Sequence, residues 1–340
     1  MKFGPIPIAQ AKGKILGHNI AGSDGRRALR KGHPLTTADI TLLQQLGKTA
    51  VYVAQLEPDD IGENEAAAQL AQAVMGPGLR LSGPATGRAN LYSDTRGLLR
   101  VDVERLARFN SSVGLTLATL PTHTALSAGK MVATLKIIPY ALPGTTVETA
   151  VAIARDGGPL LSLDPLPQRR VGLILSGSLP AQERVARSFQ NALGERLSAL
   201  GSAIRQVDYV PLEDEADEQA LATAIRRHHQ AGLDLVILAG ETAIMDRYDI
   251  APRAVERAGG IITCFGAPVD PGNLLLLAYL DRLPILGAPG CARSPKDNIV
   301  DLVLPRLLVG DRLTQADIID LGHGGLMEDV PERPLPRSRL

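Results

Sequence analysis

The sequence predicts an α/β protein in which a β-rich, mixed α+β module precedes a doubly wound, three-layer α/β domain. Three observations predict this class. Beyond residue 168, short apolar runs alternate with segments of helical spacing. Before residue 150, short β-rich runs are broken by Gly and Pro, and a Gly- and Pro-rich stretch without periodicity separates the two parts. We therefore expect a module over residues 1–160, an α/β domain over 168–325 and a tail over 326–340.

Two segments of the amino-terminal module have helical signals. The helix expected over residues 37–46 is capped by Thr36 or Thr37 and ends at Gly47, while residues 63–74 end before Gly76. These segments are expected to be helices among short strands. The expected strands are residues 50–53, 98–101, 115–120 and 131–138.

The second part begins as a strand, a turn and a helix. Residues 170–176 are an apolar run, and apolar residues then recur at every third or fourth position over 181–200, before Gly201. Strands that are apolar throughout are typical of parallel sheets buried on both faces. The further expected elements are strand 204–210, helix 217–231, strand 234–239, helix 251–258, strands 261–264, 274–280 and 283–286, and helix 296–309.

Composition excludes several classes of function. The 340 residues include 36 Lys+Arg and 36 Asp+Glu, and a net charge of zero gives no long-range field to hold nucleic acid or an anionic membrane. Cys264 and Cys291 cannot form a disulfide scaffold, and no apolar run approaches the roughly 20 residues of a membrane helix. We expect a cytoplasmic protein that binds neither nucleic acid nor membrane. Any anionic ligand must then be bound by a local cluster of donors or cations.

Three glycine-containing turns follow apolar strands, at residues 175–178, 239–243 and 287–294. At the carboxyl ends of parallel strands, such turns expose backbone N–H groups and helix N-termini that bind phosphate. Arg293 adds a guanidinium that can donate two hydrogen bonds to a phosphate. The sequence therefore predicts a phosphate-bearing ligand at these turns. The hydroxyl groups available there are those of Ser176, Ser178, Thr242 and Ser294.

Two carboxylates follow the second turn. Asp246 and Asp249 could hold Mg²⁺ together with phosphate oxygens, because Mg²⁺ commonly takes one or two protein carboxylates. The alternative for Asp249 is that it caps the helix beginning near Pro252.

Three segments of this part resemble the signature segments of the molybdopterin-binding domain shared by molybdopterin adenylyltransferases and molybdotransferases. They are Gly-Glu-Thr-Ala-Ile-Met-Asp-Arg-Tyr-Asp-Ile-Ala-Pro at 240–252, Pro-Val-Asp-Pro-Gly-Asn at 268–273 and Leu-Gly-Ala-Pro-Gly-Cys-Ala-Arg-Ser at 286–294. The family patterns are Gly-Gly-x-Ser/Thr-x-Gly-x-x-Asp, Pro-Gly-Lys-Pro and Gly-Leu-Pro-Gly-Asn-Pro-x-Ser, in that order.

The resemblance covers roughly residues 169–310, and residues 29–40 and 46–53 more loosely resemble the β-rich early segment of the molybdotransferases. It is closest to bacterial molybdopterin-binding proteins, some of which carry a nucleotidyltransferase-like domain after this unit. It implies that Gly240 and Thr242 lie against the terminal phosphate and that Asp246 is a catalytic or Mg²⁺-binding residue. The full expected site is Ser176, Gly177, Gly240, Glu241, Thr242, Asp246, Asp249, Pro271, Gly272, Asn273, Pro289, Gly290, Arg293 and Ser294.

The chain departs from the family at charged positions. Glu241 replaces the second Gly, and Asp270 and Asn273 replace lysines that help hold molybdate in the molybdotransferases. Losing cations and gaining an anion weakens oxyanion binding, by about 1–4 kcal/mol for each close pair. The early Thr-Gly-Asp-Glu-Leu and Asp-x-Asn motifs of the family are also missing.

These departures from the family therefore favour pterin binding over molybdenum insertion. The favoured function is to bind molybdopterin or the finished molybdenum cofactor as a carrier or presenting protein. The alternatives are a Mg²⁺-dependent molybdopterin adenylyltransferase or molybdotransferase, and a nucleotide-binding regulatory domain. Expected partners are a pterin phosphate ligand, a second copy of the chain, and a nucleotidyltransferase or a molybdoenzyme maturation protein.

One cysteine and two neighbouring histidines are also candidates for reactive or ligand-binding side chains. Cys291 lies inside the third turn and is a thiolate nucleophile, a ligand toward a metal-bound cofactor, or an inert small residue. His228 and His229 lie beside Arg226 and Arg227 on an expected helix, and we expect both histidines to be exposed to solvent.

Overall fold

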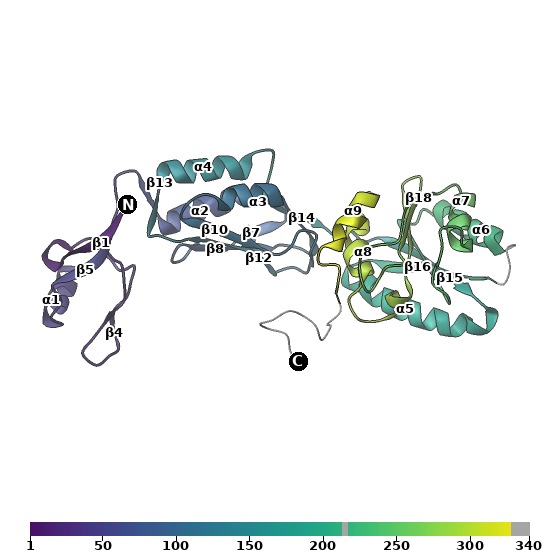
Figure 1. The fold of residues 1–340 in the computed structure, drawn as a ribbon, viewed down its shortest axis with the longest axis horizontal. Helices are drawn as coiled ribbons and strands as arrows, with labels where there is room; N and C mark the ends of the chain where they lie inside the picture. Colours follow the sequence, from purple (N-terminus) through teal and green to yellow (C-terminus); the bar gives the residue numbers. More distant parts are fainter. Residues whose placement is uncertain (213–216, 328–340) are drawn as a thin grey trace. The chain divides into compact units, whose positions relative to one another are not determined.

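A computed structural model of the chain describes residues 1–212 and 217–327 and divides into two compact units, Met1–Asp164 and Pro165–Leu340 (Figure 1). Both units mix helices and strands, as expected for an α/β protein. Residues 328–340, most of the expected tail, lie outside the described residues. None of the helices in the described ranges combines the length and apolar character that crossing a bilayer requires.

The first unit begins with a small β-rich cluster. Its central strand β5 pairs antiparallel with β1 and β2, and Leu43 of α1 joins a buried cluster with Leu16 and Val53. The strands β3 and β4 form a separate hairpin. The bounds are β1 (Lys2–Pro7), β2 (Ile15–Leu16), β3 (Ile20–Ala21), β4 (Arg27–Leu29), α1 (Thr37–Gln45) and β5 (Ala50–Gln55).

The rest of this unit is built on a four-stranded sheet in the order β10-β12-β8-β7, with α2 packed on β8 and β12. The expected helices at 37–46 and 63–74 are confirmed as α1 and α2, whereas α3 and α4 were not expected. The buried residues of α4 are Val147, Ala150 and Ala154, which form a weak apolar stripe. The bounds are β6 (Asp60–Gly62), α2 (Glu63–Val74), β7 (Leu79–Leu81), β8 (Arg88–Ser93), β9 (Gly97–Val101), α3 (Val103–Asn110), β10 (Leu115–Thr119), β11 (Ala125–Leu126), β12 (Met131–Ile137), β13 (Ala141–Pro143), α4 (Gly144–Arg155) and β14 (Leu161–Pro165).

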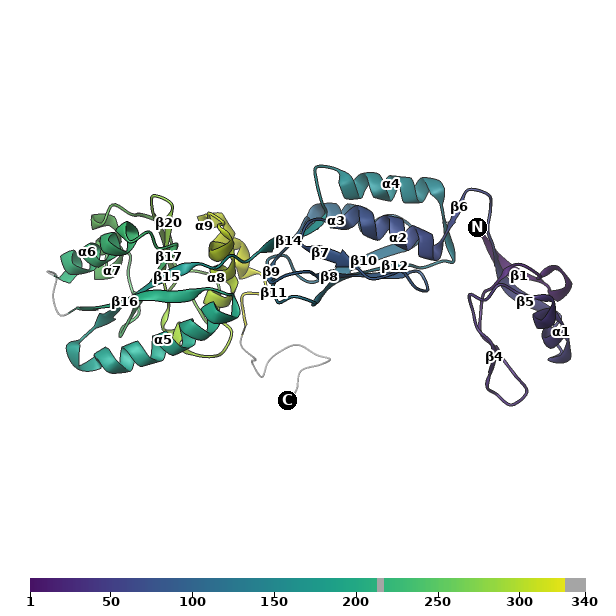
Figure 2. The ribbon, with the colours of Figure 1, turned by 180° about the vertical axis from the view of Figure 1, so that it is seen from behind.

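The second unit contains a six-stranded sheet in the order β16-β15-β17-β20-β19-β18. In Figures 1 and 2, α5 lies on one side of this sheet and α6 and α7 lie on the other. The expected strands and helices are all present, and α9 was not expected. The bounds are β15 (Arg170–Gly177), α5 (Gln182–Ala199), β16 (Ala203–Pro211), α6 (Asp217–Gln230), β17 (Leu235–Gly240), α7 (Ile250–Arg257), β18 (Ile261–Phe265), β19 (Leu276–Leu280), β20 (Leu283–Gly287), α8 (Ile299–Val309) and α9 (Gln315–Ile319).

The expectation of a parallel sheet holds for β16, β15, β17 and β20, and it fails at β19. This strand runs antiparallel to both of its neighbours. Only Asp281 and Arg282 separate β19 from β20, and a two-residue connection can join only antiparallel strands. The sheet is therefore mixed.

The sheet order brings four loops to one edge. β15, β17 and β20 are parallel neighbours, so the turns that follow them emerge together. The β18–β19 connection joins them, because Phe265 pairs with Leu276 and Leu276 pairs with Gly287 at the end of β20. All the expected site residues lie in or beside these four loops.

Candidate functional site

The first turn is closed by a carboxylate from the second turn. The backbone N–H of Ser178 donates to Oε2 of Glu241 at 3.0 Å, and the Ser178 hydroxyl donates to the same oxygen at 2.8 Å. Nη2 of Arg184, in the first turn of α5, donates to Oε1 at 2.7 Å. Hydrogen bonds from Ser178, the backbone bond first, hold the pKa of Glu241 below its ordinary value. The donors that a phosphate would use at this turn are bound to the chain's own side chain.

A glycine makes this close approach possible. Gly177 has a φ of 149°, and a Cβ placed on it would lie 2.6 Å from the Cβ of Glu241. Next to it, the hydroxyl of Tyr209 donates to the carbonyl of Ser178 at 2.7 Å, and the N–H of Glu241 donates to the carbonyl of Ser176 at 2.8 Å. The first two turns are therefore joined into one unit by hydrogen bonds.

The second turn carries the expected acidic residues. Asp249 caps α7, because its carboxylate accepts from the N–H of Ile250 at 2.9 Å and from that of Met245 at 3.1 Å. Asp246 is exposed, and its Oδ1 accepts from the N–H of Tyr248 at 2.8 Å. Across the described residues, no group of three or more His, Cys, Asp or Glu is placed to hold a metal. Magnesium at Asp246 would therefore need ligands from a bound phosphate.

The β18–β19 connection is held against α8. Gly272 has a φ of 142°, and a Cβ there would overlap the side chain of Ile299. The N–H of Ile299 donates to the carbonyl of Pro271 at 3.1 Å, and the N–H of Asp270 donates to the carbonyl of Gly325 at 2.8 Å. The contacts with Ile299 of α8 and with Gly325 hold this loop, which includes Asn273, in place.

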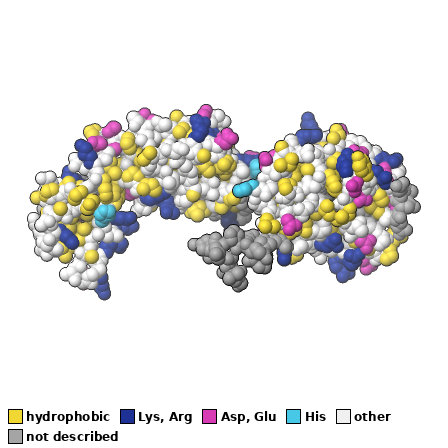
Figure 3. Space-filling model, in the orientation of Figure 1, with side chains coloured by type: hydrophobic (Ala, Val, Ile, Leu, Met, Phe, Trp, Pro, Cys, Tyr) yellow, Lys and Arg dark blue, Asp and Glu magenta, His cyan; other side chains and the backbone are white. Residues whose placement is uncertain are grey.

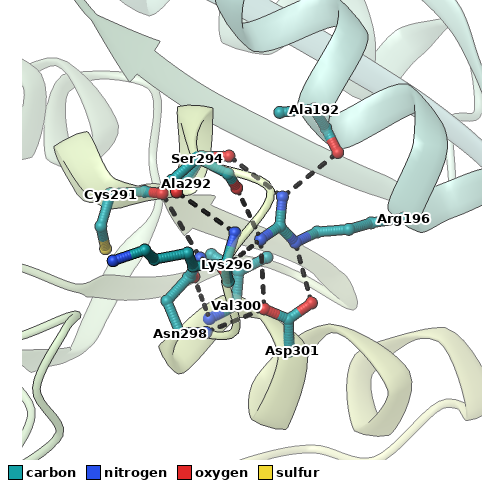
Figure 4. Close-up of polar contacts among 9 residues, drawn as sticks. All are labelled: Ala192, Arg196, Cys291, Ala292, Ser294, Lys296, Asn298, Val300 and Asp301. Carbon is teal, nitrogen blue, oxygen red and sulfur yellow. Dashed lines mark hydrogen bonds and ion pairs between the residues drawn. The ribbon is translucent and has the colours of Figure 1, made fainter. Parts of the chain in front are cut away.

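The third turn is organised by Arg196 of α5, which the sequence reasoning missed (Figure 4). Its guanidinium forms two hydrogen bonds with the carboxylate of Asp301, at 2.8 and 3.2 Å. It also donates to the carbonyls of Ser294 and Lys296, both at 2.9 Å. The signal was available: position 196 follows the buried Phe189 and Ala192 at helical spacing, so a charged residue there needs partners.

The environment of the third turn also sets the protonation state of the Cys291 thiol. Burial raises the pKa of its thiol above the ordinary value, and a backbone hydrogen bond and the charge of Arg196 oppose this only in part. A raised pKa keeps the sulfur protonated near neutral pH, which does not favour a thiolate nucleophile.

Five of the expected site residues line two different spaces, and the other nine line neither of them. The first, which we call the edge pocket, is about 150 Å³ and is lined by Ser176, Gly240, Thr242 and Asp249 together with apolar residues. The second, the α5 groove, is about 750 Å³ and runs between α5 and the third turn. The polar and charged residues of the α5 groove are Glu183, Arg184, Arg187, Ser188, Asn191, Glu195 and Arg293.

Arg293 is thus separated from the smaller pocket. Its Nε donates to the carbonyl of Gly290 at 2.9 Å, and its guanidinium lies 5.3 Å from the ring centre of Phe189. Arg293 lines the α5 groove, and so does Arg187.

The expectation that His228 is exposed was wrong. Its side chain is fully buried, and its Nε2 lies 2.6 Å from Oδ2 of Asp208. The space comes from Gly172 of β15, where a Cβ would overlap the imidazole. Burial lowers the pKa of His228, although the hydrogen bond to Asp208 opposes the shift. The neighbouring His229 is partly exposed.

Comparisons of the sequence with known proteins give one match, over a short segment of the chain. The model of a family described as Domain of unknown function (DUF8806) matches residues 5–55. A search of curated proteins gives no match.

Among solved structures, a molybdenum cofactor biosynthesis protein from Pyrococcus furiosus aligns with 94% of this chain at 14% identity and a TM-score of 0.24. The alignment spans 65% of that protein. A molybdopterin biosynthesis moea protein from Pyrococcus horikosii aligns with 90% of this chain and 75% of its own length, at 14% identity and a TM-score of 0.31. The molybdopterin biosynthesis enzyme MoaB from Thermus thermophilus aligns over 42% of this chain and 98% of its own length, at 19% identity and a TM-score of 0.30. Similarity at this level carries no argument about function.

Proposed function

We propose that the second unit binds molybdopterin or the finished molybdenum cofactor, as a carrier or presenting protein. The observation that carries this proposal is the convergence of the three family-like segments, 240–252, 268–273 and 286–294, at one edge of the six-stranded sheet. Ligands of open α/β sheets bind at this edge. The position of α5 opposite α6 and α7 supports the doubly wound, three-layer arrangement that the proposal includes.

The α5 groove is the larger of the two spaces, and of the three segments only 286–294 lines it, through Arg293. Small-molecule sites commonly occupy about 300–1,000 Å³. The groove, at about 750 Å³, lies in this range, whereas the edge pocket, at about 150 Å³, is too small for a pterin. The guanidinium groups of Arg187 and Arg293 match a phosphate in charge and geometry. We assign the phosphate to Arg293 and the pterin to the groove beside α5.

The charges favour a binding protein over a transferase. Glu241 already uses the donors of the first turn, so an oxyanion has fewer partners there. Asp270 and Asn273 stand in the loop where the molybdotransferases have lysines. One observation supports the transferase alternative: the exposed Asp246 could hold Mg²⁺ against a phosphate.

Purification of the full chain from cells that make the cofactor tests the proposal. We expect fluorescent oxidised pterin in the preparation and no turnover that depends on molybdate or on ATP with Mg²⁺. Pterin together with such turnover would favour the transferase. A preparation without pterin would contradict both functions.

A further inference from the structure

We propose that the first unit holds a separate site for a small, phosphate-bearing molecule. The site is a cavity of about 900 Å³, which we call the basic pocket. It lies between the β4–α1 connection, the start of α2, and the strands β8 and β12. Its lining residues are Ala28, Leu29, Arg30, Lys31, Gly32, His33, Pro34, Asp39, Glu63, Asn64, Thr86, Arg88, Lys136, Ile138 and Tyr140.

The carboxylates of the pocket are already bound to other groups. Oδ2 of Asp39 accepts from the N–H and the hydroxyl of Thr36, at 2.7 and 2.6 Å, and lies 2.8 Å from Nε2 of His33. Glu63 lies 3.6 Å from Nζ of Lys136. These contacts use both acidic side chains and offset the charge of Lys136.

Three cations remain for a ligand. Arg30, Lys31 and Arg88 are exposed at the pocket, and the described part of the chain shows no carboxylate paired with any of them. Two guanidinium groups and an ammonium can neutralise a dianion, and Arg binds phosphate oxygens through two donors at once. An uncompensated cluster of this kind in a cavity favours an anionic ligand.

The charge and the size of the basic pocket favour a small anionic molecule over a long polyanion. Residues 5–55 carry seven Lys+Arg and two Asp+Glu, and Figure 3 shows Lys and Arg side chains gathered near β4. The whole chain is nevertheless neutral, which disfavours binding to a long polyanion. The volume falls within the range of small-molecule sites. Ile138, whose surface is 62% exposed, and Tyr140 give the pocket an apolar wall for the uncharged part of a ligand.

This site does not depend on the function proposed for the second unit. Its residues all lie within the first unit, and they overlap the segment matched by the family of unknown function. The pocket would retain its chemistry whether or not the second unit binds a pterin.

Isothermal titration of the full chain with pyrophosphate tests the inference. An Arg293→Ala background removes the contribution proposed for the α5 groove. We expect saturable binding at one site, weakened at least tenfold by Arg88→Ala and by the double change Arg30→Ala with Lys31→Ala. The matched control changes Arg26 and Arg27 to Ala; both are exposed in the same hairpin region and do not line the pocket. We expect this control to change the affinity less than twofold, and thermal melts to show that every variant is folded.

Three results would overturn the inference. The first is the absence of saturable pyrophosphate binding. The second is an equal loss of affinity in the Arg26 and Arg27 control, because binding would then reflect general electrostatic attraction. The third is tighter binding of an oligonucleotide or an acidic peptide than of pyrophosphate, because the pocket would then take a different class of ligand.

Discussion

Glu241 accepts two hydrogen bonds from Ser178 on a single carboxylate oxygen, one from the backbone N–H at 3.0 Å and one from the hydroxyl at 2.8 Å. These two residues lie 63 positions apart in the sequence and at the ends of neighbouring parallel strands. The carboxylate therefore occupies donors that the turn would otherwise offer to an anionic ligand.

Replacement of Glu241 should open the first turn to anions. In Glu241→Ala, the carboxylate is removed, so the N–H and hydroxyl of Ser178 and the guanidinium of Arg184 become available to phosphate. We expect tighter binding of inorganic phosphate, measured by isothermal titration. Glu148→Ala removes one negative charge at an exposed position that lines neither the α5 groove nor the basic pocket, and it serves as the control. An equal gain in both variants would show that only the overall charge matters.

Arg196 should be essential for the third turn. Removing one partner of a largely buried ion pair typically costs about 3–5 kcal/mol, because the other charge is left without compensation. We expect Arg196→Met to lower the free energy of unfolding by about this amount in urea titrations. Arg187→Ala, on the exposed face of the same helix, should change it by less than about 0.5 kcal/mol. Equal stability of the two variants would contradict the assigned role.

His228 should make stability depend on pH. Its pKa is lowered in the folded chain, so the unfolded chain takes up a proton at a higher pH. The stabilisation is complete above the ordinary pKa of about 6.5 and is lost as the pH falls below it. Urea titrations between pH 7.5 and 5 should show a smaller decline for His228→Gln than for the unchanged chain. His229→Gln should leave the decline as it is, and a similar effect of both changes would argue against a buried His228.

Gly172 should tolerate no larger residue. A methyl group there overlaps the buried imidazole of His228, and overpacking of this kind typically costs about 1–3 kcal/mol. We expect Gly172→Ala to lower the melting temperature. Gly194→Ala is the matched control, because a Cβ at that helical position meets no atom within 4 Å. The control should raise stability by up to about 1 kcal/mol, and a neutral Gly172→Ala would contradict the packing.

The sequence was most informative where one local pattern decides the structure. The apolar strands of the second unit and the glycine-ended helix α5 follow from patterns within one segment. The meeting of the turns at one edge then follows from the direction of the strands.

Contacts between distant segments could not be predicted in the same way. The burial of His228 depends on Gly172, and the partners of Arg196 lie about 100 positions later. In the same way, the resemblance placed Glu241 beside the expected phosphate, but its hydrogen bond with Ser178, 63 positions earlier, could not be read from the sequence. The helix α4 was missed because much of its buried face is small alanine side chains.

The amount of pterin bound per chain tests the central claim most directly. The unchanged protein, Arg293→Ala and the surface control Arg205→Ala would be purified from cells that make the cofactor, and oxidised pterin would be measured by fluorescence. A lost hydrogen bond to a charged group costs about 1.5–3 kcal/mol, or roughly a 10- to 150-fold loss of affinity. We predict comparable pterin in the unchanged protein and Arg205→Ala, and a large loss in Arg293→Ala. Absence of pterin from the unchanged protein would contradict the claim.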